Sequence, residues 1–92
     1  MLQKYERPTD LQEMRKRIAL RHVDFPRKAG KVLRFAIEHP ADTAFSTISH
    51  LARQCRVSNA TVLRLPGLFG FNNFHEFREL FRAEIRRARR WD

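Results

Sequence analysis

The 92-residue sequence has little of what several common classes of protein need. It holds one cysteine, so no disulfide can form within the chain, which is compatible with a reducing compartment. It holds three glycines and four prolines, few for an architecture of strands and tight turns. No apolar run approaches the ~20 residues of a membrane span, and the first ten residues lack the apolar stretch of a signal peptide. We therefore expect a cytoplasmic protein that is not anchored in a membrane.

Acidic residues are scarce relative to basic ones. The chain has 10 Asp and Glu against 19 Lys and Arg, which gives a formal net charge of +9. Such an excess favours a polyanionic partner, because neutralising phosphates releases the counterions condensed on them. Nucleic acid is the first candidate, and an anionic membrane surface is the second. With 42% hydrophobic and 32% charged residues, we expect one folded domain rather than a disordered chain.

What the sequence does have is apolar residues at helical spacing, with no strand-like alternation longer than a few residues. A first helix is expected to begin at Thr9 or Asp10, with Glu13 as the return member of a capping box, and to end near 22–24. Its apolar positions are Leu11, Met14 and Ile18.

Two prolines bound the second expected helix. Pro26 suits a first helical turn, and Pro40 should end the helix, because the residue before a proline is pushed out of the α region. A loop is expected over 41–44. The apolar stripe between the prolines is formed by Ala29, Val32, Leu33, Ala36 and Ile37.

Two short helices joined by a tight turn are expected next, over 46–69. Ser46 or Thr47 can cap the first of them, and Ser58 can cap the second. The expected apolar positions of the pair are Phe45, Ile48, Leu51, Ala52 and Cys55, then Val62, Leu65 and Phe69. Two helices that cross steeply need small or apolar residues at set separations, and five residues meet that need, namely Ala52, Cys55, Val57, Val62 and Leu65. The segment is therefore predicted to be a helix-turn-helix.

A turn over 69–73 leads to the last expected helix. Its core-facing positions are Phe74, Phe77, Leu80, Phe81 and Ile85. The arginine-rich end of the chain is expected to be a basic tail or a continuation of this helix.

The second helix of a helix-turn-helix is the element that enters the major groove of DNA. Its exposed positions here are expected to be Asn59, Ala60, Thr61 and Arg64. Asn can pair with adenine, Arg with guanine, and a Thr methyl can contact thymine, while a helix N-terminus can hold a phosphate. The same pattern is open to a purely structural interpretation of Asn59 and Thr61 as capping residues, and Arg64 could instead contact a phosphate.

The sequence resembles the RpiR-type bacterial transcription regulators. The run from Leu51 to Leu65 is similar to their recognition motif, and the segments 36–40 and 44–45 are similar to its flanks. The run from Gly70 to Phe77 is similar to their "LGF-x-x-F/Y-x-E-F/L" segment. The similarity extends over residues 9–86.

The resemblance implies an all-α, five-helix bundle containing a helix-turn-helix, homeodomain-like and without a wing, over residues 1–86. Residues 87–92 would then be a basic tail or the start of an interdomain linker.

Relatives of this type form dimers or tetramers that control sugar-catabolism genes, and a phosphosugar effector binds their C-terminal sugar-isomerase-like domain, which these 92 residues do not include. The partners expected here are double-stranded DNA and a second copy of the chain. The residues expected to contact DNA are Ser46, Thr47, Arg56, Ser58, Asn59, Ala60, Thr61 and Arg64.

Two positions depart from the family pattern. Arg56 stands where glycine is usual, at a turn that often needs a positive φ, and an arginine there costs about 1 kcal/mol. Pro66 stands where relatives continue a basic helix, and a proline in a regular helix interior costs about 3 kcal/mol. The recognition helix is therefore predicted to kink or stop near Leu65, after its first two turns.

The remaining chemistry-bearing residues indicate neither an enzyme nor a metal site. The four histidines form no i, i+4 pair, the acidic residues are scattered singly, and Cys55 lies on an expected buried face. No cofactor is expected. Two alternatives stay open beside specific DNA binding: an adaptor or dimerisation module whose helix-turn-helix has lost DNA binding through Pro66, and charge-driven binding of RNA or of any DNA sequence.

Overall fold

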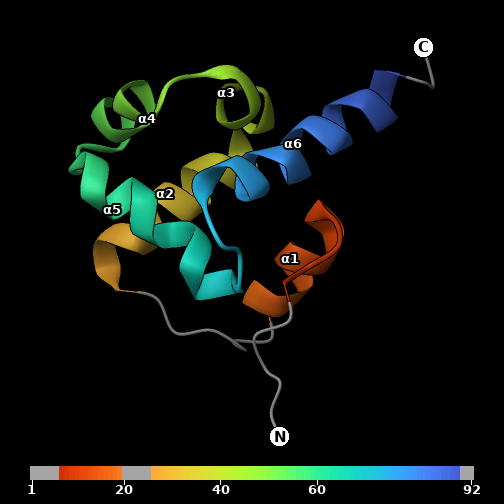
Figure 1. The fold of residues 1–92 in the computed structure, drawn as a ribbon, viewed down its shortest axis with the longest axis horizontal. Helices are drawn as coiled ribbons and strands as arrows, with labels where there is room; N and C mark the ends of the chain where they lie inside the picture. The colour runs from red at the N-terminus through yellow and green to blue at the C-terminus, as the bar shows by residue number, and fades with distance from the viewer. Residues whose placement is uncertain (1–6, 20–25, 90–92) are drawn as a thin grey trace, which may run out of the picture.

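The computed structural model describes residues 7–19 and 26–89, and within them helices joined by short turns are the regular elements, with no strand (Figure 1). The elements in chain order are α1 (Leu11–Ala19), α2 (Arg27–Glu38), α3 (Pro40–Phe45), α4 (Ile48–Cys55), α5 (Asn59–Arg64), a 3₁₀-helix η1 (Leu65–Phe69) and α6 (Phe74–Arg89). The all-α fold with its helix-turn-helix is confirmed. The expected end of the first helix lies outside the described residues.

The first and last helices begin with the same arrangement of side chains. At α1, Asp10 Oδ1 accepts a hydrogen bond from the Glu13 backbone N–H at 2.8 Å, and Glu13 accepts one from the Thr9 N–H at 2.7 Å. At α6, Asn73 Oδ1 accepts from the Glu76 N–H at 2.9 Å, and Glu76 accepts from the Asn72 N–H at 2.9 Å. The capping box predicted at α1 is present, although the Glu13 carboxylate accepts from the backbone N–H of Thr9 rather than from that of Asp10.

The expected loop over 41–44 is wrong, because this segment is helix α3. Pro40 ends α2 and is also the first residue of α3, a position where its missing N–H costs nothing. Thr43 is buried and bonds through its hydroxyl to the His39 carbonyl at 3.2 Å, so the short helix turns a polar residue inward at little cost. The bond from Ser46 N–H to the Asp42 carbonyl closes its last turn.

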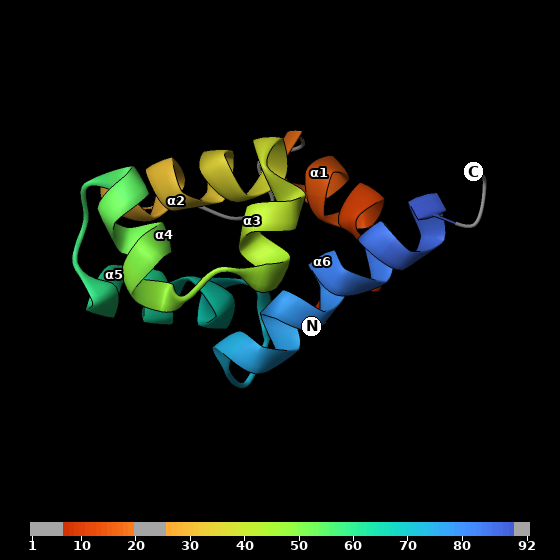
Figure 2. The same cartoon turned by 90° about the horizontal axis from the view of Figure 1, so that it is seen from above.

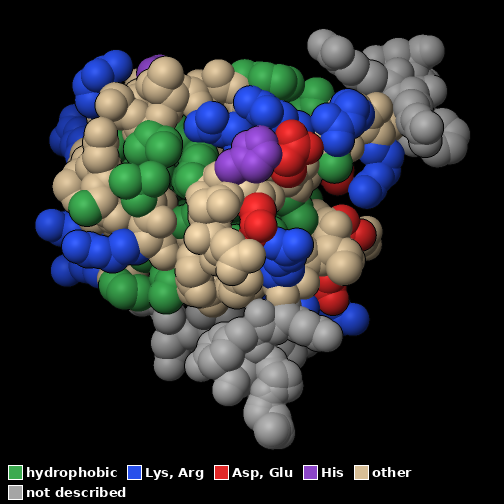
Figure 3. Space-filling view, in the orientation of Figure 1, with side chains coloured by type: hydrophobic (Ala, Val, Ile, Leu, Met, Phe, Trp, Pro, Cys, Tyr) green, Lys and Arg blue, Asp and Glu red, His purple; other side chains and the backbone are tan. Residues whose placement is uncertain are grey.

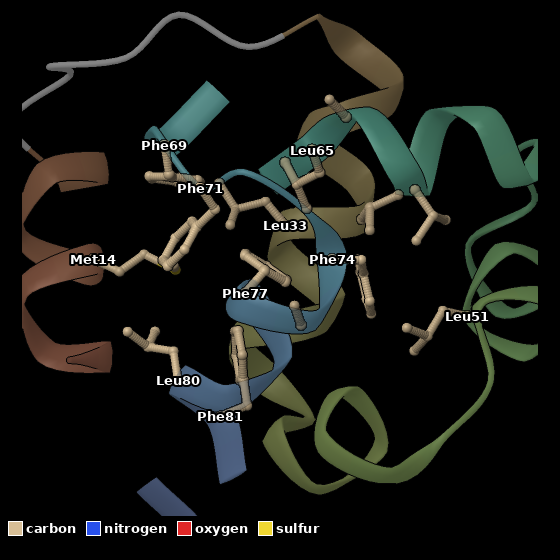
Figure 4. Close-up of a cluster of buried hydrophobic side chains, with 14 of the residues drawn as sticks. Met14, Leu33, Leu51, Leu65, Phe69, Phe71, Phe74, Phe77, Leu80 and Phe81 are labelled. Atoms are coloured by element: carbon tan, nitrogen blue, oxygen red, sulfur yellow. The ribbon is translucent and has the colours of Figure 1, made fainter. Parts of the chain in front are cut away.

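Aromatic residues of α6 and of the turn before it fill the centre of the core (Figure 4). Phe77 is fully buried, and its ring centroid lies 5.5 Å from that of Phe74 and 5.0 Å from that of Phe81. Met14 of α1 and Leu33 of α2 point toward the same cluster. The predicted core positions of α2 and α6 are confirmed as buried, except Ile37 and Ile85, which are partly buried against the same core.

The helix-turn-helix lies at one end of the molecule. Figure 2 shows α4 and α5 at that end and α1 with the C-terminal half of α6 at the other. Helix α2 runs between them and contacts both α4 and α5. Phe45, expected on the apolar side of the helix-turn-helix, is instead 63% exposed at the end of α3. Its ring is contacted by the Arg82 guanidinium, whose Cζ lies 5.8 Å from the ring centroid.

Candidate nucleic-acid interface

The turn between α4 and α5 is closed by Arg56 in the left-handed conformation, with φ 59° and ψ 47°. Its N–H donates to the Arg53 carbonyl at 3.2 Å, and the Val57 N–H donates to the Ala52 carbonyl at 3.0 Å. These two bonds make a Schellman motif, which satisfies carbonyls that the end of a helix leaves free. The positive φ expected at Arg56 is confirmed, and the arginine side chain is exposed.

The five packing positions predicted from the sequence hold the two helices together. Ala52, Cys55, Val62 and Leu65 are buried, and Val57 is half-buried against the same core. Burial raises the pKa of the Cys55 thiol, an effect that the nearby Lys31 charge opposes, so Cys55 stays a neutral packing residue.

Side chains fasten the beginning of α5 to its neighbours. Ser58 caps the helix as predicted, since its hydroxyl accepts from the Thr61 N–H at 3.2 Å. Asn59 donates one amide proton to the hydroxyl of Ser49 on α4 at 3.1 Å. This bond uses one of three hydrogen-bonding groups of the amide, so the oxygen and a second proton remain for a ligand.

One side of α5 faces outward and is formed by Asn59, Ala60, Leu63 and Arg64. These positions lie together because residues three and four apart share a helix face. The predicted exposure of Asn59, Ala60 and Arg64 is confirmed, whereas Thr61 is half-buried, turned toward Ser58 and α2. Leu63, 51% exposed, was not singled out in the sequence. Its i, i+4 spacing from Asn59 is the signal that could have found it.

Pro66 ends the regular helix where the sequence predicted. Helix α5 stops at Arg64, and the chain continues as the 3₁₀-helix η1, with Pro66 and Phe69 buried. Pro66 stands in the first turn of η1, where a backbone N–H has no partner within the helix, so the proline is accommodated after the outward-facing residues. Gly70, with φ 88°, closes η1.

Two arginines of α6 bind backbone carbonyls just before the start of α4. Thr47, rather than Ser46, is the cap: its hydroxyl accepts from the His50 N–H at 3.0 Å. Ser46 is half-buried, and its carbonyl accepts from Arg78 Nη2 at 2.7 Å, while Arg82 Nε donates to the Ala44 carbonyl at 2.9 Å. Partial burial lowers the pKa of Arg78, and its guanidinium lies over the Phe74 ring at 4.9 Å. Thr47 is exposed, so of the two it is the one in reach of a ligand.

The surface around α4, α5 and the start of α2 is basic. Between residues 43 and 75 the sequence contains no Asp or Glu. Arg27, Lys28 and Arg64 line one pocket of about 300 Å³ together with Thr61, and Arg53 and Arg56 lie exposed beside the turn. In Figure 3, Lys and Arg side chains lie along the left edge of the molecule over α4, α5 and the beginning of α2 and also over α6, whereas the acidic side chains visible in this view lie over α6 and α1.

Other kinds of site receive no support from the described part of the chain. Over residues 7–19 and 26–89, no three His, Cys, Asp or Glu side chains cluster as metal ligands would. None of the helices described is both long and apolar enough to span a bilayer.

Comparison with known proteins identifies the family. Residues 12–87 match the family model described as "Helix-turn-helix domain, rpiR family". No curated protein and no solved structure matched the chain. The match covers most of the chain and includes the turn, the cap and the aromatic segment described above. The chain belongs to the rpiR family of helix-turn-helix domains, and it is a DNA-binding domain of a transcription regulator.

Proposed function

We propose that this domain binds duplex DNA in a sequence-specific way by inserting α5 into the major groove. The observation that carries the proposal is the outward face of α5, which exposes Asn59, Ala60 and Arg64 within a stretch of chain, residues 43–75, that has no Asp or Glu and is edged by arginine and lysine. Base edges in the major groove offer donors, acceptors and the thymine methyl, and these side chains complement all three.

Asn59 is assigned to an adenine. Its bond to Ser49 fixes the amide plane, and the groups left over are one donor and one acceptor, the pair that adenine N7 and N6 require. Arg64 is assigned to a guanine, with a backbone phosphate as the alternative, because it shares a pocket with Arg27 and Lys28. Thr61 is assigned a lesser part through its methyl group, since it is half-buried.

Phosphate contacts are assigned to the basic residues around this face. Arg53 and Arg56 lie on the turn side, and Lys28 or Lys31 lies on the α2 side. The exposed hydroxyls of Thr47 and Ser58, at the starts of α4 and α5, would approach the same strand. Ser46, expected from the sequence to contact DNA, is assigned no contact, because it is half-buried and its backbone groups bond to Asp42 and Arg78. Such contacts position the protein and make its affinity depend on salt, but they carry no sequence information.

We further propose that the domain works as a homodimer in a bacterial regulator of sugar or phosphosugar genes. One domain of this size covers a single half-site, and two half-sites supply the tight complex. A phosphosugar effector would act through a C-terminal domain joined to α6. The competing role as an adaptor without DNA binding depends on Pro66, and the position of Pro66 after Arg64 speaks against it.

The test begins with duplexes selected from a random library by the full 92-residue chain. Wild type and Arg64→Ala are then titrated against the selected duplex and a scrambled one at several salt concentrations. If Arg64 contacts a base, Arg64→Ala reduces the difference in binding free energy between the selected and the scrambled duplex by about 1–3 kcal/mol. If Arg64 contacts a phosphate, both duplexes weaken equally. If wild type binds no duplex even at low salt, or binds selected and scrambled duplexes equally, specific DNA binding is refuted.

A further inference from the structure

Leu63 is the large apolar side chain on the outward face of α5, one residue before the helix ends at Arg64. It is 51% exposed, and it belongs neither to the buried core nor to the half-buried residues packed against that core. The inward face of the same helix is supplied by Val62, with Leu65 beginning the next element. Packing within the domain therefore gives no reason for a leucine at this position.

The neighbours of Leu63 are the residues assigned above to base edges. Asn59 lies four residues before it and Ala60 three before it, so all three share one face, and Arg64 is next to it in the chain. Four residues of helix rise about 6 Å, which is no more than two base-pair steps along DNA. If α5 inserts as proposed, an apolar side chain there would lie at the base edges, close to the pair assigned to Asn59.

We infer that Leu63 contacts the C5-methyl group of a thymine and so determines sequence preference at one base pair. This inference rests on the proposed function. The thymine methyl is the apolar group that a base edge offers in the major groove, and cytosine lacks it. Water leaves both surfaces when they meet, so an otherwise unexplained exposed leucine gains a partner only if the base is thymine.

The experiment is a double-mutant cycle between the protein and the thymine methyl. In the selected duplex, each thymine is replaced singly by deoxyuridine, which removes the methyl and leaves the pairing intact. Wild type and Leu63→Ala are titrated against every duplex. At one thymine, wild type is expected to lose about fourfold in affinity, the equivalent of about 0.8 kcal/mol for one buried methylene-sized group, while Leu63→Ala loses almost nothing.

Phe45→Ala is the matched control, because Phe45 is also large, apolar and exposed but lies at the end of α3. It should keep the full deoxyuridine effect of wild type. The inference is overturned if every deoxyuridine effect is the same in wild type and Leu63→Ala, or if Phe45→Ala abolishes the effect as well, and in both cases specific binding itself still stands. Failure to obtain any preferred duplex overturns the proposed function and this inference together.

Discussion

The segment formed by α5 and η1 is closed at both ends by the same kind of turn, but different residues adopt the left-handed conformation. Before α5 it is Arg56, at φ 59°, and after η1 it is Gly70, at φ 88°. Each turn has the paired bonds of a Schellman motif, at 3.2 and 3.0 Å in the first and at 3.1 and 3.1 Å in the second. Glycine adopts this conformation freely, whereas an arginine pays about 1 kcal/mol.

The surroundings of the two turns account for this difference. The residue after Gly70 is Phe71, which is buried and meets the Phe77 ring edge-on at 5.8 Å. The residue after Arg56 is Val57, which is half-buried on the exposed basic end of the molecule. The second turn therefore places an aromatic residue in the core. The first keeps a strained arginine exposed, at the position to which the proposed function assigns a phosphate contact.

The largest effect that separates the turns should come from the apolar residue that follows each one. Phe71→Ala is expected to destabilise the domain by about 3–5 kcal/mol, because a buried ring leaves a cavity. Val57→Ala should cost clearly less, since Val57 is smaller and only half-buried. Denaturant unfolding measures both, and equal costs would show that the two turns are anchored alike.

The next largest change in stability is expected from substituting Gly70 itself. Gly70→Ala is expected to cost about 1–2 kcal/mol, because a Cβ clashes with the following carbonyl at positive φ. Gly67→Ala is the matched control: a Cβ there meets no atom within 4 Å, so a gain of about 0.4–1 kcal/mol is expected. Thermal or denaturant unfolding distinguishes them, and a loss of similar size in both variants would remove the conformational explanation.

At the first turn, stability and binding should change in opposite directions. Arg56→Gly is expected to stabilise the domain by up to about 1 kcal/mol and to lower the slope of log affinity against log salt by about 0.9, the share of one phosphate contact. Arg56→Ala should lower the slope equally without the gain in stability, because alanine keeps the strain. An unchanged slope in both variants would mean that Arg56 touches no phosphate.

The smallest effect concerns pH. The Asn72 backbone N–H, followed by the Asn72 side chain and Arg7, holds the pKa of Glu76 below its ordinary value. A carboxyl whose pKa is lowered by folding stabilises above its unfolded pKa of about 4.3, and this contribution disappears as the pH falls through the folded pKa. Unfolding midpoints should therefore fall less steeply on acidification below about pH 5 in Glu76→Gln than in wild type. Parallel curves would refute the role of this carboxylate in fastening the second turn.

Much of the fold could be predicted because the signals are local. Caps such as Asp10 and Ser58, the helical spacing of apolar residues and the end of α5 at Pro66 depend on neighbours along the chain. Helix α3 was missed because Pro40 was interpreted only as a stop, although a proline can also begin a helix. The exposure of Phe45 could not be predicted, because it depends on how α3 packs against α6.

The candidate site was predictable in part for the same reason. Helical periodicity placed Asn59, Ala60 and Arg64 on the outer face, and the structure agrees. The bond between Asn59 and Ser49 joins residues ten apart on two different helices, which sequence spacing alone does not reveal. The DNA contacts of all these residues remain predictions.

The measurement that tests the central proposal most directly is the specificity ratio of Asn59→Ala, that is, its affinity for the selected duplex divided by that for the scrambled duplex. Because Asn59 lies on the exposed face of α5, the account predicts a ratio about ten-fold or more below that of wild type, while loss of the hydrogen bond to Ser49 lowers stability by only about 0.5–1.5 kcal/mol. An unchanged ratio in this folded variant would contradict base reading by the outward face of α5.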